Sequence, residues 1–178
     1  MALVGGGRRP RFPNTRVVIW DDVKRKALLL LDFMLPVLNV FLLRIKIVVA
    51  LENQVLVYGF LSPPRKLAAY DLHNPCGLIA MASHPEGLIL TFPARQTGQI
   101  QIVDIPLGVN GRSSVQIVRA HHGAIQCIAL SRSGQYVALA LETGTIIRVH
   151  LTKSTALAFE FRRGLDKATI SSMAFSPD

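Results

Sequence analysis

The sequence predicts an all-β protein assembled from a repeated unit of short strands. Runs rich in valine, isoleucine and aromatic residues recur along the 178 residues, and helical periodicity is weak throughout. Comparable strand ends fall at Trp20, Tyr58, Val103 and Val149, which are steps of 38, 45 and 46 residues. A repeat of about 40–45 residues with four strands is typical of one blade of a WD-type β-propeller. We therefore expect a partial WD-repeat β-propeller of about three to four blades, with a β-sandwich as the alternative.

The strands expected in the N-terminal half begin with Arg16–Trp20, which reads RVVIW. Two more are expected at Lys46–Leu51 and Gln54–Tyr58. Between them stands Glu52-Asn53, a polar pair suited to a two-residue hairpin turn. These two strands are therefore expected to pair as a hairpin.

The C-terminal half repeats the pattern, with glycine-containing turns between apolar runs. Five strands are expected there: Leu88–Phe92, Gln99–Asp104, Ile125–Leu130, Tyr136–Leu141 and Thr145–His150. Ser133-Gly134 and Thr143-Gly144 are the turn signals that separate the last three. Ile170–Phe175 reads as the start of another unit, and the chain opens with a strand-like ALVGGG. We therefore expect residues 1–178 to form one partial propeller domain, truncated at both ends relative to the whole fold.

The most apolar stretch, Ala27–Leu51, requires a test for a membrane-spanning helix. Charged, polar and proline residues interrupt it: Asp32, Pro36, Asn39, Arg44 and Lys46. A charge near the middle of a spanning helix costs about 2.5–3.5 kcal/mol on insertion scales. Buried strands separated by a proline-containing turn are therefore the expected structure, and the N-terminus has no apolar segment typical of a secretory signal.

Composition excludes several classes of function. Lys plus Arg number 20 against 11 Asp plus Glu, and this formal charge of +9 indicates a polyanionic partner. Nucleic acid, a phosphorylated headgroup and an anionic membrane all remain open on charge alone. Cys76 and Cys127 are too few for a disulfide framework or a zinc site, so a reducing compartment is expected. None of the five histidines stands in a catalytic motif, and we expect no enzyme activity, no metal and no cofactor.

Basic residues gather near the N-terminus, at Arg8, Arg9, Arg11, Arg16, Lys24, Arg25 and Lys26. The cluster lacks the interleaved aromatic residues on which nucleic-acid bases stack. Solvated loop charge is the preferred interpretation, followed by a surface for protein or membrane contact. Nucleic acid ranks last, and no nucleic-acid partner is expected.

The segment Phe161-Arg162-Arg163-Gly164 is the most informative one for function. Successive side chains of an extended chain point to opposite sides, so the two arginines can serve two neighbouring pockets. Guanidinium groups are permanently charged and make bidentate hydrogen bonds to phosphate oxygens. Glycine after them permits a tight turn or close approach of the backbone.

This FRRG segment resembles the signature of the PROPPIN family, the phosphoinositide-binding propellers that include the WIPI proteins. Further segments resemble the same family in the same order: ALVGGGRRPRFPNTRVVIWDD, IVVALENQVLVYGF, NPCGLIAM, TGQIQIVD, AHHGAIQCIALSRSG and ETGTIIRVH. The resemblance therefore spans nearly the whole chain.

The resemblance implies a seven-bladed propeller that binds phosphatidylinositol 3-phosphate and phosphatidylinositol 3,5-bisphosphate in two rim pockets. On matching positions, Arg162 would serve the first pocket and Arg163 the second. His121, Thr145 and Arg148 resemble further residues of the first pocket. Leu141 departs from the family, which commonly has a serine at this position before the Glu-Thr-Gly-Thr turn.

The resemblance also implies the biological role. It indicates a cytoplasmic adaptor of autophagosome formation, peripheral on the phagophore assembly site or on endosomal or vacuolar membranes. Its partners would be 3-phosphorylated phosphoinositides and a lipid-transfer protein of the autophagy machinery. Two other functions remain as alternatives, a generic WD-repeat scaffold without lipid specificity and an electrostatic nucleic-acid binder.

Overall fold

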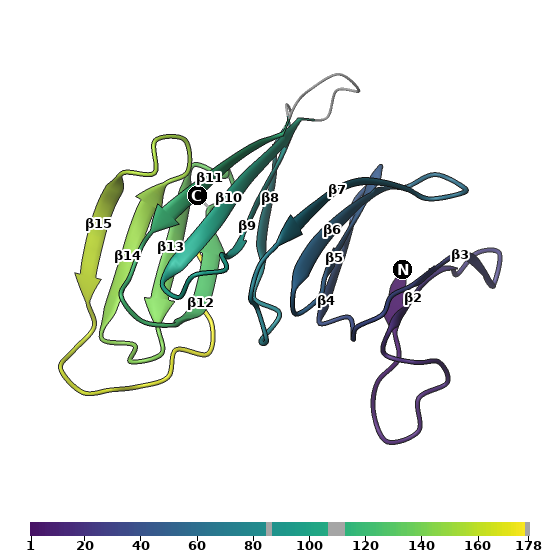
Figure 1. Ribbon diagram of the computed structural model, residues 1–178, viewed down its shortest axis with the longest axis horizontal. Coiled ribbons are helices and arrows are strands. Elements are labelled where there is room, and N and C mark those ends of the chain that lie inside the picture. The colour runs from purple at the N-terminus through teal and green to yellow at the C-terminus, as the bar shows by residue number, and fades with distance from the viewer. Residues whose placement is uncertain (85–86, 107–112, 177–178) are drawn as a thin grey trace. The chain divides into compact units, whose positions relative to one another are not determined.

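The computed structural model describes residues 1–84, 87–106 and 113–176. Within these ranges the regular elements are fifteen β-strands, and no helix is long and apolar enough to cross a membrane (Figure 1). The chain divides into two compact units, Met1–Gly77 and Leu78–Asp178, which are described separately. The all-β prediction is confirmed.

The first unit contains one three-stranded and one four-stranded antiparallel sheet. Their strands are β1 (Ala2–Val4), β2 (Arg16–Asp21), β3 (Lys26–Asp32), β4 (Asn39–Leu42), β5 (Lys46–Ala50), β6 (Gln54–Gly59) and β7 (Arg65–Asp71). Each strand pairs with the next one in sequence within its sheet. The predicted turn at Glu52-Asn53 joins β5 to β6 and is closed by a 2.8 Å bond from the Leu51 amide to the Gln54 carbonyl.

The two sheets of this unit share one apolar core. Side chains of β2 and β3 pack there with side chains of β5 and β6, and the buried members are Val17, Ile19, Leu29, Leu31, Val37, Ile47, Val49, Leu51 and Leu56. Removal of this much aliphatic surface from water is the main favourable contribution to packing of the two sheets.

The apolar stretch Ala27–Leu51 forms strands, as predicted, with Pro36 in the connection between β3 and β4. The prediction that its strands are buried is wrong for β4, in which no residue is buried, and for one face of β3. Leu29 and Leu31 are 9% and 6% exposed, whereas Leu28 and Leu30 are 43% and 52% exposed. Because side chains alternate along a strand, Leu29 and Leu31 of β3 share the face that packs into the core of this unit, whereas Leu28 and Leu30 share the exposed face.

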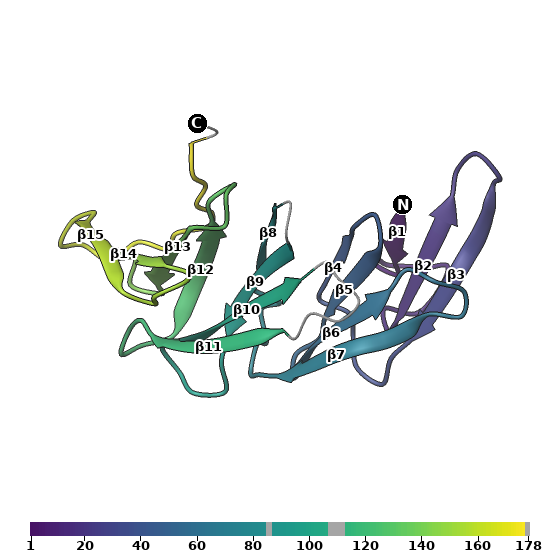
Figure 2. The ribbon, with the colours of Figure 1, turned by 90° about the horizontal axis from the view of Figure 1, so that it is seen from above.

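The second unit contains two four-stranded antiparallel sheets (Figures 1 and 2). The first sheet consists of β8 (Ala80–His84), β9 (Gly87–Pro93), β10 (Gln99–Pro106) and β11 (Ser114–Arg119). The second consists of β12 (Ile125–Leu130), β13 (Tyr136–Leu141), β14 (Ile146–Leu151) and β15 (Leu157–Arg162). Both are meanders, because each strand neighbours the next one in sequence.

The spacing that predicted a repeat corresponds to equivalent strands. Tyr58, Val103 and Val149 lie on β6, β10 and β14, the third strand of each four-stranded sheet. Trp20 lies on β2, the middle strand of the three-stranded sheet. The repeat is therefore one antiparallel sheet, which is the architecture of a propeller blade.

An apolar core also joins the two sheets of the second unit. Its buried members are Ile89, Ile100, Ile102, Val118 and Ala120 from the first sheet side, with Ile125, Val137 and Leu139 from the second. The candidate functional residues lie on β14 and just after β11, in the part of this unit where the core joins the two sheets.

Ile170–Phe175, which was expected to start another unit, forms no strand, and the described residues after β15 contain none. A strand requires a neighbouring strand for its backbone hydrogen bonds. This segment instead packs Met173 and Phe175 beside Ala138 and Val149 of the last sheet.

Candidate functional site

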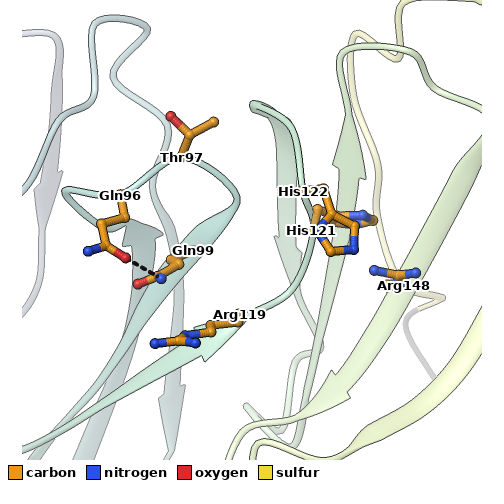
Figure 3. Close-up of a pocket in the computed structure, with 7 residues that line it drawn as sticks. All are labelled: Gln96, Thr97, Gln99, Arg119, His121, His122 and Arg148. Carbon is orange, nitrogen blue, oxygen red and sulfur yellow. Dashed lines mark hydrogen bonds between the residues drawn. The ribbon is translucent and has the colours of Figure 1, made fainter.

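A polar pocket of about 400 Å³ lies in the second unit, where the β9–β10 turn faces the connection from β11 to β12 (Figure 3). Its lining residues carry amide, hydroxyl, imidazole or guanidinium groups: Gln96, Thr97, Gln99, Arg119, His121, His122 and Arg148. The lining contains no carboxylate among the described residues, so the pocket favours an anionic ligand.

His121 provides a hydrogen-bonding atom inside this pocket. The residue is 8% exposed, and its Nε2 atom has no hydrogen-bond partner among the described residues. Its backbone amide donates to the Gly98 carbonyl at 3.0 Å, and a Cβ on Gly98 would collide with the His121 carbonyl. Glycine with a φ of +78° at position 98 therefore permits the close approach of the β9–β10 turn to His121.

The electrostatic environment of His121 favours the neutral form of its ring. Burial lowers the pKa of the imidazole, and the positive charge of Arg148 lowers that pKa further. A hydrogen bond between the ring and the Leu139 backbone opposes this shift, as does the Glu160 charge. An anion bound beside the ring would therefore favour its protonation.

Arg148 is held by two hydrogen bonds. Its Nε donates to Glu160 Oε2 at 2.8 Å, and its Nη1 donates to the Ala120 carbonyl at 2.6 Å. The bond to Ala120 fixes the guanidinium beside the segment that carries His121. Its Nη2 makes no hydrogen bond to another described residue, so this group remains available to a ligand.

Arg163 is held in a loop rather than in a pocket. Its Nε donates to the Gly144 carbonyl at 2.8 Å, and its Nη2 donates to the Asp166 carbonyl at 2.6 Å. The backbone amide of Arg163 also donates to the Thr145 carbonyl at 2.8 Å. The guanidinium thus fastens the loop after β15 to the β13–β14 turn.

Arg162 is the last residue of β15 and is exposed to solvent. In the β14–β15 ladder, Arg162 is opposite Ile146, and Glu160 is opposite Arg148. Arg162 is thus two residues from Glu160 along β15. Because side chains alternate along a strand, Arg162 lies on the same face of the sheet as Arg148. It makes no hydrogen bond or ion pair with another described residue.

The structure therefore brings together only part of the predicted site. His121 and Arg148 line the pocket, whereas Thr145 and Arg162 are absent from its lining among the described residues. Phe161 lies on the opposite face and stacks on Phe159 with ring centroids 6.1 Å apart.

Of the two roles considered for Gly164, a tight turn and a close approach of the backbone, the close approach is not seen, because a Cβ at this glycine would contact no described atom within 4 Å. Five lining residues were missed from sequence: Gln96, Thr97, Gln99, Arg119 and His122. Only the proximity of Arg119 and His122 to His121 in the sequence could have indicated two of them.

These features define a class of protein, a WD-type β-propeller with a basic pocket between two adjacent blades. The PROPPIN family model matches residues 19–178, and the chain belongs to the PROPPIN family. SVP1-like protein 2 of Debaryomyces hansenii is 49% identical over a 207-residue alignment that covers 100% of this chain and 48% of the relative. The protein of the same name from Pichia angusta is also 49% identical, with 100% and 50% covered.

A solved structure supports the fold. Kluyveromyces lactis Hsv2 matches with a TM-score of 0.78 and 28% identity, over 92% of this chain and 50% of that chain. This chain thus spans about half the length of the relatives it matches, so its fold is part of a β-propeller.

Proposed function

We propose that this chain is the phosphoinositide-binding part of a non-enzymatic adaptor that acts in autophagosome formation. One observation carries the proposal: the buried Nε2 of His121 has no hydrogen-bond partner in the described part of the chain, and His121 lines a basic pocket. An unpaired polar atom in such a position costs about 1–3 kcal/mol unless a ligand or water satisfies it. A phosphate oxygen beside Arg148 would satisfy it.

The lining residues suit a phosphorylated inositol ring. The free Nη2 of Arg148 donates a charge-assisted hydrogen bond to a phosphate, and His121 becomes a second charged donor when protonated. The ring hydroxyls of inositol would meet the amide and hydroxyl groups of Gln96 and Thr97. Pockets for small ligands span about 300–1,000 Å³, and this pocket of about 400 Å³ falls in that range.

The FRRG arginines and Thr145 would act at the edge of the pocket. Arg162 lies on the same face of the sheet as Arg148 and makes no hydrogen bond or ion pair with another described residue, so it can turn toward a headgroup at the membrane surface. Arg163 would serve a second pocket only after its guanidinium releases the carbonyls of Gly144 and Asp166. Thr145 lies beside Arg163 through their backbone hydrogen bond and would add a neutral donor.

The role in the cell follows from the ligand. Phosphatidylinositol 3-phosphate and phosphatidylinositol 3,5-bisphosphate would recruit the protein from the cytoplasm to phagophore, endosomal or vacuolar membranes. There it would bring in a lipid-transfer protein of the autophagy machinery. The charge of +9 would add nonspecific attraction to anionic membranes.

Flotation with liposomes tests the proposal. One set of vesicles contains phosphatidylinositol 3-phosphate, and the other contains phosphatidylserine at matched total negative charge. The chain is expected to float with the first set in clear excess, and Arg162→Ala is expected to reduce that excess. Lys153→Ala, which removes an exposed charge at the β14–β15 turn, is the matched control and should have little effect.

Two results would contradict the proposal. Equal flotation with both sets would indicate nonspecific electrostatic attraction to anionic membranes. Absence of flotation by the soluble folded chain would favour a scaffold for protein contacts.

A further inference from the structure

The pocket contains a second guanidinium that the FRRG segment does not supply. Arg119 is the last residue of β11, opposite Gln99 of β10 in the ladder of the first sheet. In Figure 3, Arg119 lies beside the two glutamines, apart from the two histidines and Arg148. The groups of the pocket that can carry positive charge therefore lie in two places, with Arg119 alone in one and His121, His122 and Arg148 in the other.

We propose that Arg119 is a specificity-determining residue that binds a second monoester phosphate, so that the pocket prefers an inositol ring with two such phosphates over a ring with one. This inference rests on the proposed function, because it assigns one contact within the same pocket. The shared chemistry is the doubly phosphorylated ring, presented either by a membrane lipid or as a free inositol phosphate.

Arg119 is available for such a contact. Its side chain is exposed and makes no hydrogen bond or ion pair with another described residue. The side-chain amides of Gln96 and Gln99 bond to each other and not to the Arg119 guanidinium, since the Gln99 Nε2 donates to Gln96 Oε1 at 2.6 Å. Arg119 can therefore adjust to a ligand without loss of a native contact.

The separation of these two places favours two phosphates over one. A single phosphate at His121 and Arg148 would use donors from the β11–β12 connection and the second sheet, and would leave Arg119 in solvent. A second phosphate across the ring would meet Arg119 on the opposite wall, where guanidinium binds it in bidentate geometry. Arg119 would then stabilise only the complex with the doubly phosphorylated ring.

The test measures binding to the soluble headgroups by calorimetry. Inositol 1,3-bisphosphate represents the ring with one monoester phosphate besides the lipid-linked position, and inositol 1,3,5-trisphosphate represents the ring with two. Arg119→Ala is expected to weaken the trisphosphate complex on the order of tenfold and the bisphosphate complex by less than about twofold. Arg119→Lys should restore part of the difference, because lysine keeps the charge without the planar fork.

Lys153→Ala is the matched control, since it removes one positive charge at the other end of the strands and should leave the ratio of the two affinities unchanged. Vesicles with the mono- or bisphosphorylated lipid form the second arm. A preference lost in both arms identifies the lipid headgroup, and a preference lost only in solution identifies a free inositol phosphate.

Three results would overturn the inference. Equal weakening of both complexes by Arg119→Ala would show that Arg119 contributes only nonspecific electrostatic attraction. Unchanged affinities would show that Arg119 does not touch the ligand. Failure of the unsubstituted chain to bind either headgroup would contradict the proposed function itself and this inference with it.

Discussion

Replacement of Arg163 by alanine should open the loop that follows β15. The substitution removes two hydrogen bonds, from Nε to the Gly144 carbonyl at 2.8 Å and from Nη2 to the Asp166 carbonyl at 2.6 Å. It keeps the backbone bonds of Arg163 to Thr145 and of Ala168 to Thr143, so the loop loses only part of its attachment.

The size of the effect follows from the nature of these bonds. A hydrogen bond from a charged donor contributes about 1.5–3 kcal/mol, and solvent exposure of one of the two reduces their sum. We expect the free energy of local opening to fall by about 2 kcal/mol, which corresponds to about a thirtyfold higher population of the open loop.

Cleavage by an endoproteinase specific for lysine measures this population. Lys167 is exposed and lies inside the loop, and the arginine substitution creates or removes no lysine site. When reclosure is faster than cleavage, the cleavage rate after Lys167 follows the open population. Mass spectrometry identifies this cut, and cleavage after Lys153 in the same chain is the internal reference.

Arg162→Ala is the matched control, because its guanidinium makes no bond to a described residue. It should leave the cleavage rate after Lys167 unchanged. Equal rates in the Arg163→Ala and unsubstituted chains would refute the assigned anchoring role.

Three further predictions concern the pocket and the thiols. Glu160→Gln should strengthen headgroup binding about threefold in calorimetry, because it removes the carboxylate 2.8 Å from Arg148; weaker binding would show that this ion pair mainly orients the guanidinium. Burial holds the pKa of His121 below its ordinary value, and a bound anion raises it, so headgroup affinity should fall as pH rises from the lowered pKa of the free ring toward the higher pKa of the complex. His121→Gln should lose this component of the pH dependence, and an identical profile would contradict the assignment. Burial also raises the pKa of the Cys127 thiol, so a disulfide reagent should label the exposed Cys76 rapidly and Cys127 only after unfolding; two equally fast thiols would contradict the packing of the last sheet.

The sequence predicted the inner parts of the sheets better than their edges. Strands such as β5 and β13 are buried on both faces, so they read as continuous apolar runs. The outer strands β7, β11 and β15 are largely exposed, and their mixed composition resembles that of loops. These strands are expected because each repeat has four strands, and their own residues do not predict them.

The sequence predicted only those residues of the candidate site that stand in a short segment resembling the family. His121 and Arg148 were expected from the family resemblance, and both line the pocket. Arg119 and the β9–β10 turn were missed, because only the packing of two sheets brings that turn to His121. The anchoring of Arg163 was missed too, since it depends on carbonyls exposed by the turn at Gly144, where φ is +62°.

The imidazole resonances of the five histidines, followed by NMR during titration with inositol 1,3-bisphosphate, test the central claim most directly. A phosphate in the pocket should shift the His121 resonance saturably and raise the pKa of that ring. His84, at the opposite end of the first sheet of the second unit, should not respond and serves as the internal control. An unaffected His121, or equal small shifts of all histidines, would contradict the assignment of this pocket as the headgroup site.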